Sequence, residues 1–170
     1  MGETQTVTAR TGQGAVRDLQ GKYLTFILGG EEYGVDIMKV REIIGVMDIT
    51  SLPQTPRFIK GVINLRGRVI PVLDLRLKFG LEEAARTQET CIIVVDLERI
   101  TMGVIVDTVS EVLDIHENEV EPAPSFGSGV DTRFIPGMAK IKGKVKILLD
   151  IESVLTAADL TVIEDTALAA

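Results

Sequence analysis

Apolar and polar residues alternate in short runs along most of the chain, and this pattern predicts a protein built mainly from strands. The apolar runs Tyr23–Leu28 and Tyr33–Ile37 are separated by Gly29-Gly30-Glu31-Glu32, a turn sequence, so they predict a β-hairpin. Further short strands are expected at 61–65, 68–76, 91–95, 101–106, 110–115 and 140–147. The expected fold class is therefore mainly β.

Two parts of the chain repeat one another closely enough to indicate an internal duplication. Residues 58–76 (FIKGVINLRGRVIPVLDLR) align with 134–152 (FIPGMAKIKGKVKILLDIE), and seven of these nineteen positions are identical. Upstream, 34–44 aligns with 103–113 in the same order. Each copy of roughly 55–60 residues has the size of a small five-stranded barrel of the OB or SH3-like kind.

The duplication predicts two tandem five-stranded OB/SH3-like barrels with short helices. We place the first barrel at residues 21–86 and the second at 87–150. A flexible N-terminal tail is expected at 1–20, which lacks any periodicity. A C-terminal helical segment is expected at 151–170, because Asp150 is a suitable N-cap. Gly67 and Gly143 should then occupy equivalent hairpin turns.

Composition removes several classes of protein. The chain has one cysteine, Cys91, and one histidine, His116, which excludes an internal disulfide and a Cys/His zinc site. A net charge of −7 and the absence of tryptophan argue against nucleic-acid binding, which needs clustered cations and stacking aromatics. No apolar run approaches the ~20 residues of a membrane helix, and no signal peptide is visible. The sequence favours a cytoplasmic protein without direct membrane insertion.

The charges are distributed unevenly along the chain. Residues 1–86 carry 12 Lys/Arg and 10 Asp/Glu, whereas residues 87–170 carry 6 and 15. Two readings stay open at this stage. Either the two halves orient the molecule between different partners, or the carboxylates simply solvate the second half.

The sequence contains no recognisable catalytic constellation. His116 lies among acidic residues, without a nucleophile beside it. Carboxylates near strand ends could form a pair, but Asp74 and Asp150 are repeat-equivalent, which favours a structural role such as capping. No cofactor or metal is therefore expected, and what remains is surface for protein partners. Arg66 stands out there as a long cation at the tip of a tight turn.

Three stretches of the chain resemble the CheW family of bacterial chemotaxis coupling proteins. They are GGEEYGVDIMKVREIIG (29–45), TPRFIKGVINLRGRVIPVLDLRLKFG (55–80) and GVIVDTVSEVLDI (103–115), and the resemblance extends over about residues 22–165. It implies two five-stranded barrels without enzymatic activity. It also implies an adaptor that bridges the cytoplasmic tips of chemoreceptors to a CheA-type histidine kinase and helps to build the signalling array.

The resemblance also implies two contact surfaces. The residues that match the kinase contact, made with the regulatory domain of the kinase, are Val40, Glu42, Ile43, Phe58 and Gly61. The residues that match the receptor contact, along the groove between the subdomains, are Arg66, Cys91, Val109 and Val112. Cys91 departs from the family pattern, in which an aliphatic residue is commoner. Part of the apolar kinase set should be exposed in the monomer.

Two alternatives come from other classes of protein. An OB-fold protein that binds nucleic acid or oligosaccharide would need a basic, aromatic-rich barrel face, which the acidic second half and the 4% aromatic content disfavour. A small β-barrel enzyme would need a nucleophile beside a base, and the sequence shows no such pair.

Overall fold

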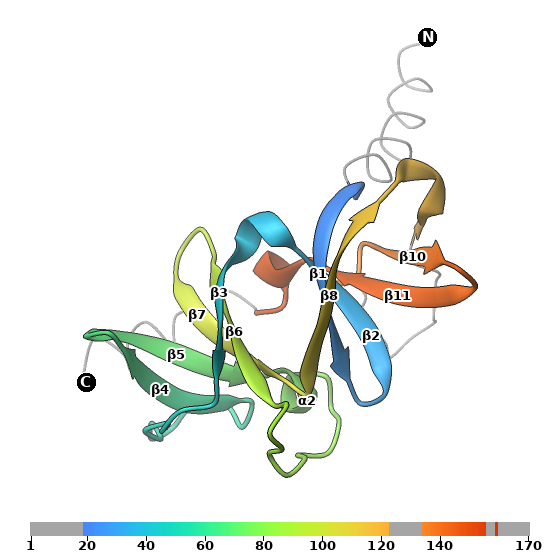
Figure 1. The fold of residues 1–170 in the computed structure, drawn as a ribbon. Helices are drawn as coiled ribbons and strands as arrows, with labels where there is room; N and C mark the ends of the chain where they lie inside the picture. The colour runs from blue at the N-terminus through green and yellow to red at the C-terminus, as the bar shows by residue number, and fades with distance from the viewer. Residues whose placement is uncertain (1–18, 123–133, 156–158, 160–170) are drawn as a thin grey trace, which may run out of the picture.

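The computed structural model describes residues 19–122, 134–155 and 159, and the regular elements in these ranges are mostly strands (Figure 1). The strands are β1 (Gly21–Leu28), β2 (Glu31–Asp36), β3 (Val40–Gly45), β4 (Ile59–Leu65), β5 (Arg68–Asp74), β6 (Cys91–Asp96), β7 (Thr101–Val106), β8 (Thr108–Ile115), β9 (Val120–Pro122), β10 (Gly137–Ile141) and β11 (Lys144–Leu149). The helical elements are η1 (Ile37–Lys39), α2 (Leu75–Lys78), η2 (Glu117–Glu119) and η3 (Ile151–Ser153).

The strands form two sheets, which lie side by side in Figure 1. One has six strands in the order β8-β1-β2-β11-β10-β9, and the other has five in the order β3-β6-β7-β5-β4. Paired strands are antiparallel except for β2 with β11 and β5 with β7, which are parallel. The mainly β fold with two small strand units is therefore confirmed.

The sheets do not divide the chain at residue 86, where the sequence repeat divides it. Strands β1 and β2 belong to the first repeat but join β8, β10 and β11 of the second, and β6 and β7 of the second repeat join β3, β4 and β5 of the first. In Figure 1 the blue β1 and β2 accordingly share a sheet with the orange β10 and β11. Each sheet thus receives the opening hairpin of the other repeat. The physical reason is that the two copies offer equivalent pairing edges, so the hairpins can be exchanged.

The hairpin tips confirm the equivalence of the two repeats. Arg66 and Gly67, between β4 and β5, have φ values of 53° and 85°, and Lys142 and Gly143, between β10 and β11, have 52° and 78°. Two successive positive φ values are those of a type I′ turn, whose twist matches the flanking strands. The expectation that Gly67 and Gly143 hold equivalent turns is therefore confirmed. In both turns the preceding long cation shares the left-handed conformation.

The two repeat-equivalent aspartates, Asp74 and Asp150, also have the same structural role. The side chain of Asp74 accepts a hydrogen bond from the backbone N–H of Leu77 at the start of α2, and that of Asp150 accepts one from Glu152 at the start of η3. Their backbone N–H groups donate to the carbonyls of Phe58 and Phe134, at 2.7 and 2.9 Å. These carboxylates cap helical turns, as the repeat suggested.

The apolar core lies in three clusters, and the largest is shared by both sheets. It contains Phe26 of β1 together with Ile93 of β6. Within β6, Ile92 and Val94 face a second cluster, inside the five-stranded unit, while Ile93 faces the shared one. Both faces of β6 are therefore covered, which explains its unbroken apolar run. A third cluster, around Ile115, fills the six-stranded unit.

Charged side chains also join the two units where the chain crosses between them. Asp107 separates β7 of one sheet from β8 of the other, and its carboxylate accepts two hydrogen bonds from Arg76, at 2.7 and 2.8 Å. The backbone N–H of Gly29 donates to the same carboxylate at 3.0 Å. Because these donors come from α2 and from the β1–β2 turn, one carboxylate links three distant segments.

The ends of the chain follow the expectations only in part. Asp150 is the expected N-cap, but the helical turn that it begins is the 3-10 helix η3, which ends at Ser153. Val154 and Leu155 follow as a buried bend, so the predicted helix does not continue there. Residues 156–158 and 160–170 of the predicted helix lie outside the described residues, as do residues 1–18 of the predicted tail.

The exchange of hairpins generates a prediction about fragments. The connection 81–89 is exposed throughout, so a protease site placed there should be cut without unfolding the protein. After separation, fragments 1–86 and 87–170 should each lose their cooperative thermal transition, because each sheet then lacks two to four of its strands. Mixing them should restore it, as circular dichroism can measure. Cooperative folding of either fragment alone would contradict the exchange.

A second prediction concerns pH. The hydrogen bonds from Arg76 hold the pKa of the Asp107 carboxyl below its usual value, against the opposing effect of burial. A pKa lowered by folding stabilises the protein above the unfolded value of about 4, and this stabilisation is lost as the pH falls through the folded-state value. We expect Asp107→Asn to lower the free energy of unfolding by about 1–2 kcal/mol at pH 7. The difference from the parent, measured by urea denaturation, should shrink toward pH 3.

Candidate functional site

Strand β3 carries three of the five residues expected to contact a kinase. Ile43 is a large apolar side chain that is 45% exposed, whereas Val40 packs partly against the shared core. Glu42, between them, is half-buried. The exposed apolar member of this set is therefore Ile43, with a carboxylate next to it.

Glu42 forms an ion pair with Arg66 that the sequence analysis did not anticipate. One terminal guanidinium nitrogen of Arg66 lies 2.5 Å from the Glu42 carboxylate. This hydrogen bond lowers the pKa of Glu42 and raises that of Arg66. The structure thus brings together one residue expected in the kinase contact and one expected in the receptor contact. The two expected surfaces meet at this ion pair.

The remaining two residues of the expected kinase contact are mainly structural. Phe58 is half-buried, and the Lys78 ammonium lies 4.4 Å from its ring centroid. Gly61 is buried with φ +142°, and a Cβ at this position would overlap the carbonyl oxygen of Thr50. Thr50 forms a β-bridge with Val62 across this point. Glycine is needed at position 61 because the two backbones pass so closely.

The expected receptor residues lie in two places. Cys91 and Val109 are together: both pack against the shared core, and the Val109 backbone forms a hydrogen bond with the thiol. Burial nevertheless raises the pKa of Cys91, which favours the protonated thiol. Val112, further along β8, is 53% exposed. Arg66 lies instead at the end of β6 that carries Val94, away from Cys91 at its start.

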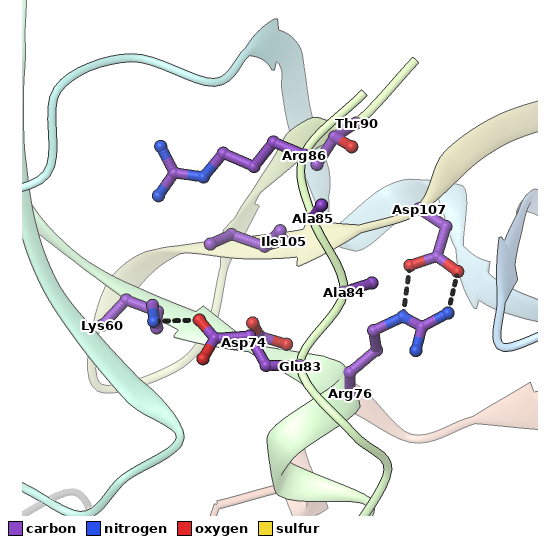
Figure 2. A pocket seen from close by; sticks show the side chains of 10 residues that line it. All are labelled: Lys60, Asp74, Arg76, Glu83, Ala84, Ala85, Arg86, Thr90, Ile105 and Asp107. Atoms are coloured by element: carbon purple, nitrogen blue, oxygen red, sulfur yellow. Dashed lines mark hydrogen bonds and ion pairs between the residues drawn. The ribbon is translucent and has the colours of Figure 1, made fainter. Parts of the chain in front are cut away.

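A small polar niche near the crossing point concentrates charged groups, and two of its cations are paired with its carboxylates (Figure 2). Its volume is about 30 Å³, which is room for little more than water. Lys60 forms an ion pair with Glu83, and Arg76 with Asp107. Burial raises the pKa of Asp74, whose side chain already caps α2. The niche therefore holds the two units together rather than exposing an acid and a base to a substrate.

The other strand-end carboxylates that could have formed a catalytic pair have structural partners as well. Asp36 accepts a hydrogen bond from Met38, and Asp96 accepts one from the Thr101 hydroxyl at 2.7 Å. Within residues 19–122 and 134–155, no cluster of three His, Cys, Asp or Glu side chains is placed to hold a metal ion. No helix in the described part of the chain is long and apolar enough to span a membrane.

Sequence reasoning missed two arginines that flank Arg66. Arg41 of β3 and Arg68 of β5 line a hollow of about 190 Å³ together with Arg66. Its other walls are formed by Leu65, Ile70, Val94 and Thr101. The spacing of Arg66 and Arg68 across a turn was a visible signal for a basic tip, but the position of Arg41 depends on how the sheet curves.

Comparison with known proteins places this geometry in a family. Residues 22–159 match the model of the CheW-like domain. The chemotaxis protein CheW of Klebsiella aerogenes is 38% identical over 146 residues, which cover 86% of this chain and 88% of that protein. CheW of Bacillus subtilis is 37% identical over 135 residues, which cover 79% and 86%. The crystal structure of the scaffolding protein CheW from Thermoanaerobacter tengcongensis superposes with a TM-score of 0.75 at 38% identity, covering 83% of this chain and 96% of that one.

The close approach at Gly61 generates a stability prediction. Gly61→Ala should lower the free energy of unfolding by about 2–4 kcal/mol, because the added methyl group overlaps the Thr50 backbone and the φ value is strained. Gly45→Ala is the matched control, since Gly45 is an exposed strand glycine with open space at its Cβ position. Chemical denaturation of the two variants measures the difference. Equal stability would show that the chain can relax around position 61.

Proposed function

Because the chain belongs to the CheW-like family, we propose that it is a non-catalytic adaptor that couples the cytoplasmic tips of chemoreceptors to a CheA-type histidine kinase in bacterial chemotaxis arrays. Two findings support the adaptor role. The curated relatives are chemotaxis proteins, and the similar crystal structure is that of a scaffolding protein. In this proposal the protein is cytoplasmic and is held at the receptor arrays through its partners.

The observation that carries the proposal is the surface of β3. Ile43 is 45% exposed, and the Glu42–Arg66 ion pair lies beside it. An exposed apolar side chain beside an ion pair fits an interface with an apolar centre and a polar rim. We assign this surface to the regulatory domain of the kinase, with Val40 and Phe58 packing beneath it and Gly61 shaping the adjacent backbone.

The receptor contact is assigned to Arg66 and to the groove residues Cys91, Val109 and Val112. Val112 supports this assignment, because it is an exposed apolar side chain on β8. Cys91 and Val109 would then form the floor of the contact, since both are only partly buried. Arg66 would act at the other end, where its planar fork can donate to carbonyl or carboxylate oxygens of a receptor helix.

The described residues give little support to the two other classes of function, an enzyme and a nucleic-acid-binding protein. The acidic side chains near the strand ends cap turns or pair with arginines. The rings of Tyr33, Phe79 and Phe134 pack against one another, at centroid distances of 5.7 and 5.1 Å, and are therefore poorly placed to stack on bases.

A pull-down separates these classes. The immobilised full-length chain should retain a soluble receptor signalling fragment and a CheA-type kinase, together and separately, and should not retain single-stranded nucleic acid. Retention of nucleic acid without either protein would overturn the adaptor assignment.

The position of Arg66 generates a prediction with a matched control. Arg66→Ala should weaken receptor binding about tenfold, the scale of a moderate interface anchor, because arginine offers a fork of donors. Lys142→Ala should have much less effect, although Lys142 has the same turn position and backbone conformation. Titration calorimetry with the receptor fragment measures both.

The ion pair requires one further control. Because Arg66→Ala leaves the Glu42 carboxylate without its partner, kinase binding should be measured for Glu42→Ala, Arg66→Ala and the double variant. We expect Glu42→Ala to weaken kinase binding and Arg66→Ala to weaken mainly receptor binding. Equal losses of receptor affinity for Arg66→Ala and Lys142→Ala would remove Arg66 from the receptor contact.

A further inference from the structure

The hollow beside Arg66 has the features of a binding site. Three arginines, Arg41, Arg66 and Arg68, line a volume of about 190 Å³. They come from β3, from the β4–β5 turn and from β5, which are separate parts of the five-stranded sheet. The side chains of Arg41 and Arg66 are 48% and 69% exposed, and their groups are therefore accessible to a ligand.

The hollow carries more positive than negative charge. Arg66 pairs with Glu42 at 2.5 Å, and Arg41 lies 3.4 Å from Asp96. The guanidinium of Arg68 donates to the hydroxyl of Thr101 at 3.1 Å. Three cations thus lie beside two carboxylates, in a protein whose net charge is −7. Each guanidinium has five N–H donors, so most of them remain available.

The lining between the arginines is polar at Thr101 and apolar at Leu65, which is half-buried. Ile70 and Val94 also belong to the lining, but they are buried core residues of the five-stranded unit. Inorganic phosphate would leave the Leu65 side chain without a contact. A carboxylate on a short aliphatic stem matches both parts, since the stem can contact Leu65 while the oxygens accept from the arginines.

In the second repeat, the position equivalent to this hollow is occupied by side chains of the protein itself. The equivalents of Ile70 and Thr101 are Lys146 and Glu32, from the repeat alignment and the hairpin register. Lys146 is buried, and its ammonium forms an ion pair with Glu32. The second unit therefore places its own carboxylate beside a cation where the first unit has a hollow.

We propose that Arg41 and Arg68, which line this hollow, bind the side-chain carboxylate of a glutamate on the kinase that docks over strand β3. This inference rests on the proposed function and deepens it. Continuity with that surface supports the kinase as the source of the glutamate, because Arg41 lies between Val40 and Glu42 on the same strand. The site adds a charged contact to the apolar contact at Ile43, and it fixes the orientation of the partner.

The binding chemistry can be tested on the protein alone. Glutarate is added to ¹⁵N-labelled protein, and the arginine Nε–Hε resonances are followed by NMR. Glutaramide, which has the same stem and no charge, is the control ligand. The expected result is saturable shifts at Arg41 and Arg68 with glutarate only, and loss of the Arg41 shift in Arg68→Gln. Equal responses to both ligands, or shifts that persist in Arg68→Gln, would overturn the site.

The occupant is tested with the kinase itself. Lys144→Gln is the matched control, because Lys144 is repeat-equivalent to Arg68 and its replacement changes the net charge equally. Arg68→Gln should weaken kinase binding about tenfold at low salt, and less at high salt, whereas Lys144→Gln should leave it unchanged. Equal effects of the two substitutions would overturn the inference. Failure of the parent protein to bind kinase would instead overturn the proposed function, and the glutarate result would still decide whether the hollow binds carboxylates.

Discussion

The exchange of opening hairpins between the repeats is the constraint on which the rest of the structure depends. The strands of each repeat are divided between the two sheets, so neither repeat completes a sheet without β1–β2 or β6–β7 from the other. The shared cluster around Phe26 and Ile93 then becomes the main core of the molecule. The crossing at Asp107 is fixed by Arg76, so the two units are coupled through their backbone, their core and their charges.

The same exchange leaves the molecule with two related but unequal outer surfaces. The hairpin tips at Arg66 and Lys142 share one backbone conformation. Their surroundings differ: Arg66 reaches Glu42, while the interior position held by Ile70 in one unit is held by Lys146 in the other. A scaffold that must distinguish partners needs this asymmetry, because similar surfaces would bind similar partners.

The sequence allowed the duplication, the strands and the hairpin turns to be predicted, because glycine, aspartate and apolar spacing act locally. The exchange could not be predicted, since both copies present the same pairing pattern and local chemistry does not say which copy supplies the hairpin. The Glu42–Arg66 pair was hidden for a related reason: its members are 24 residues apart, and only the curvature of the sheet brings them together. Gly61 matched the family pattern, but its close approach to the Thr50 backbone can be seen only in the structure.

The charged residues of the described chain divide by what surrounds them. Carboxylates at chain crossings and turns, such as Asp74 and Asp107, are partly or largely buried and hold the fold. Arg66, Arg41 and Asp96 are more exposed, and ion pairs of this kind contribute little to stability. These charges therefore contribute free energy mainly when a bound partner excludes water from them. The attraction between an arginine and a carboxylate is then stronger, and a charged group that is buried without a partner destabilises the complex. A surface of this kind discriminates between partners without contributing much to the stability of the free protein.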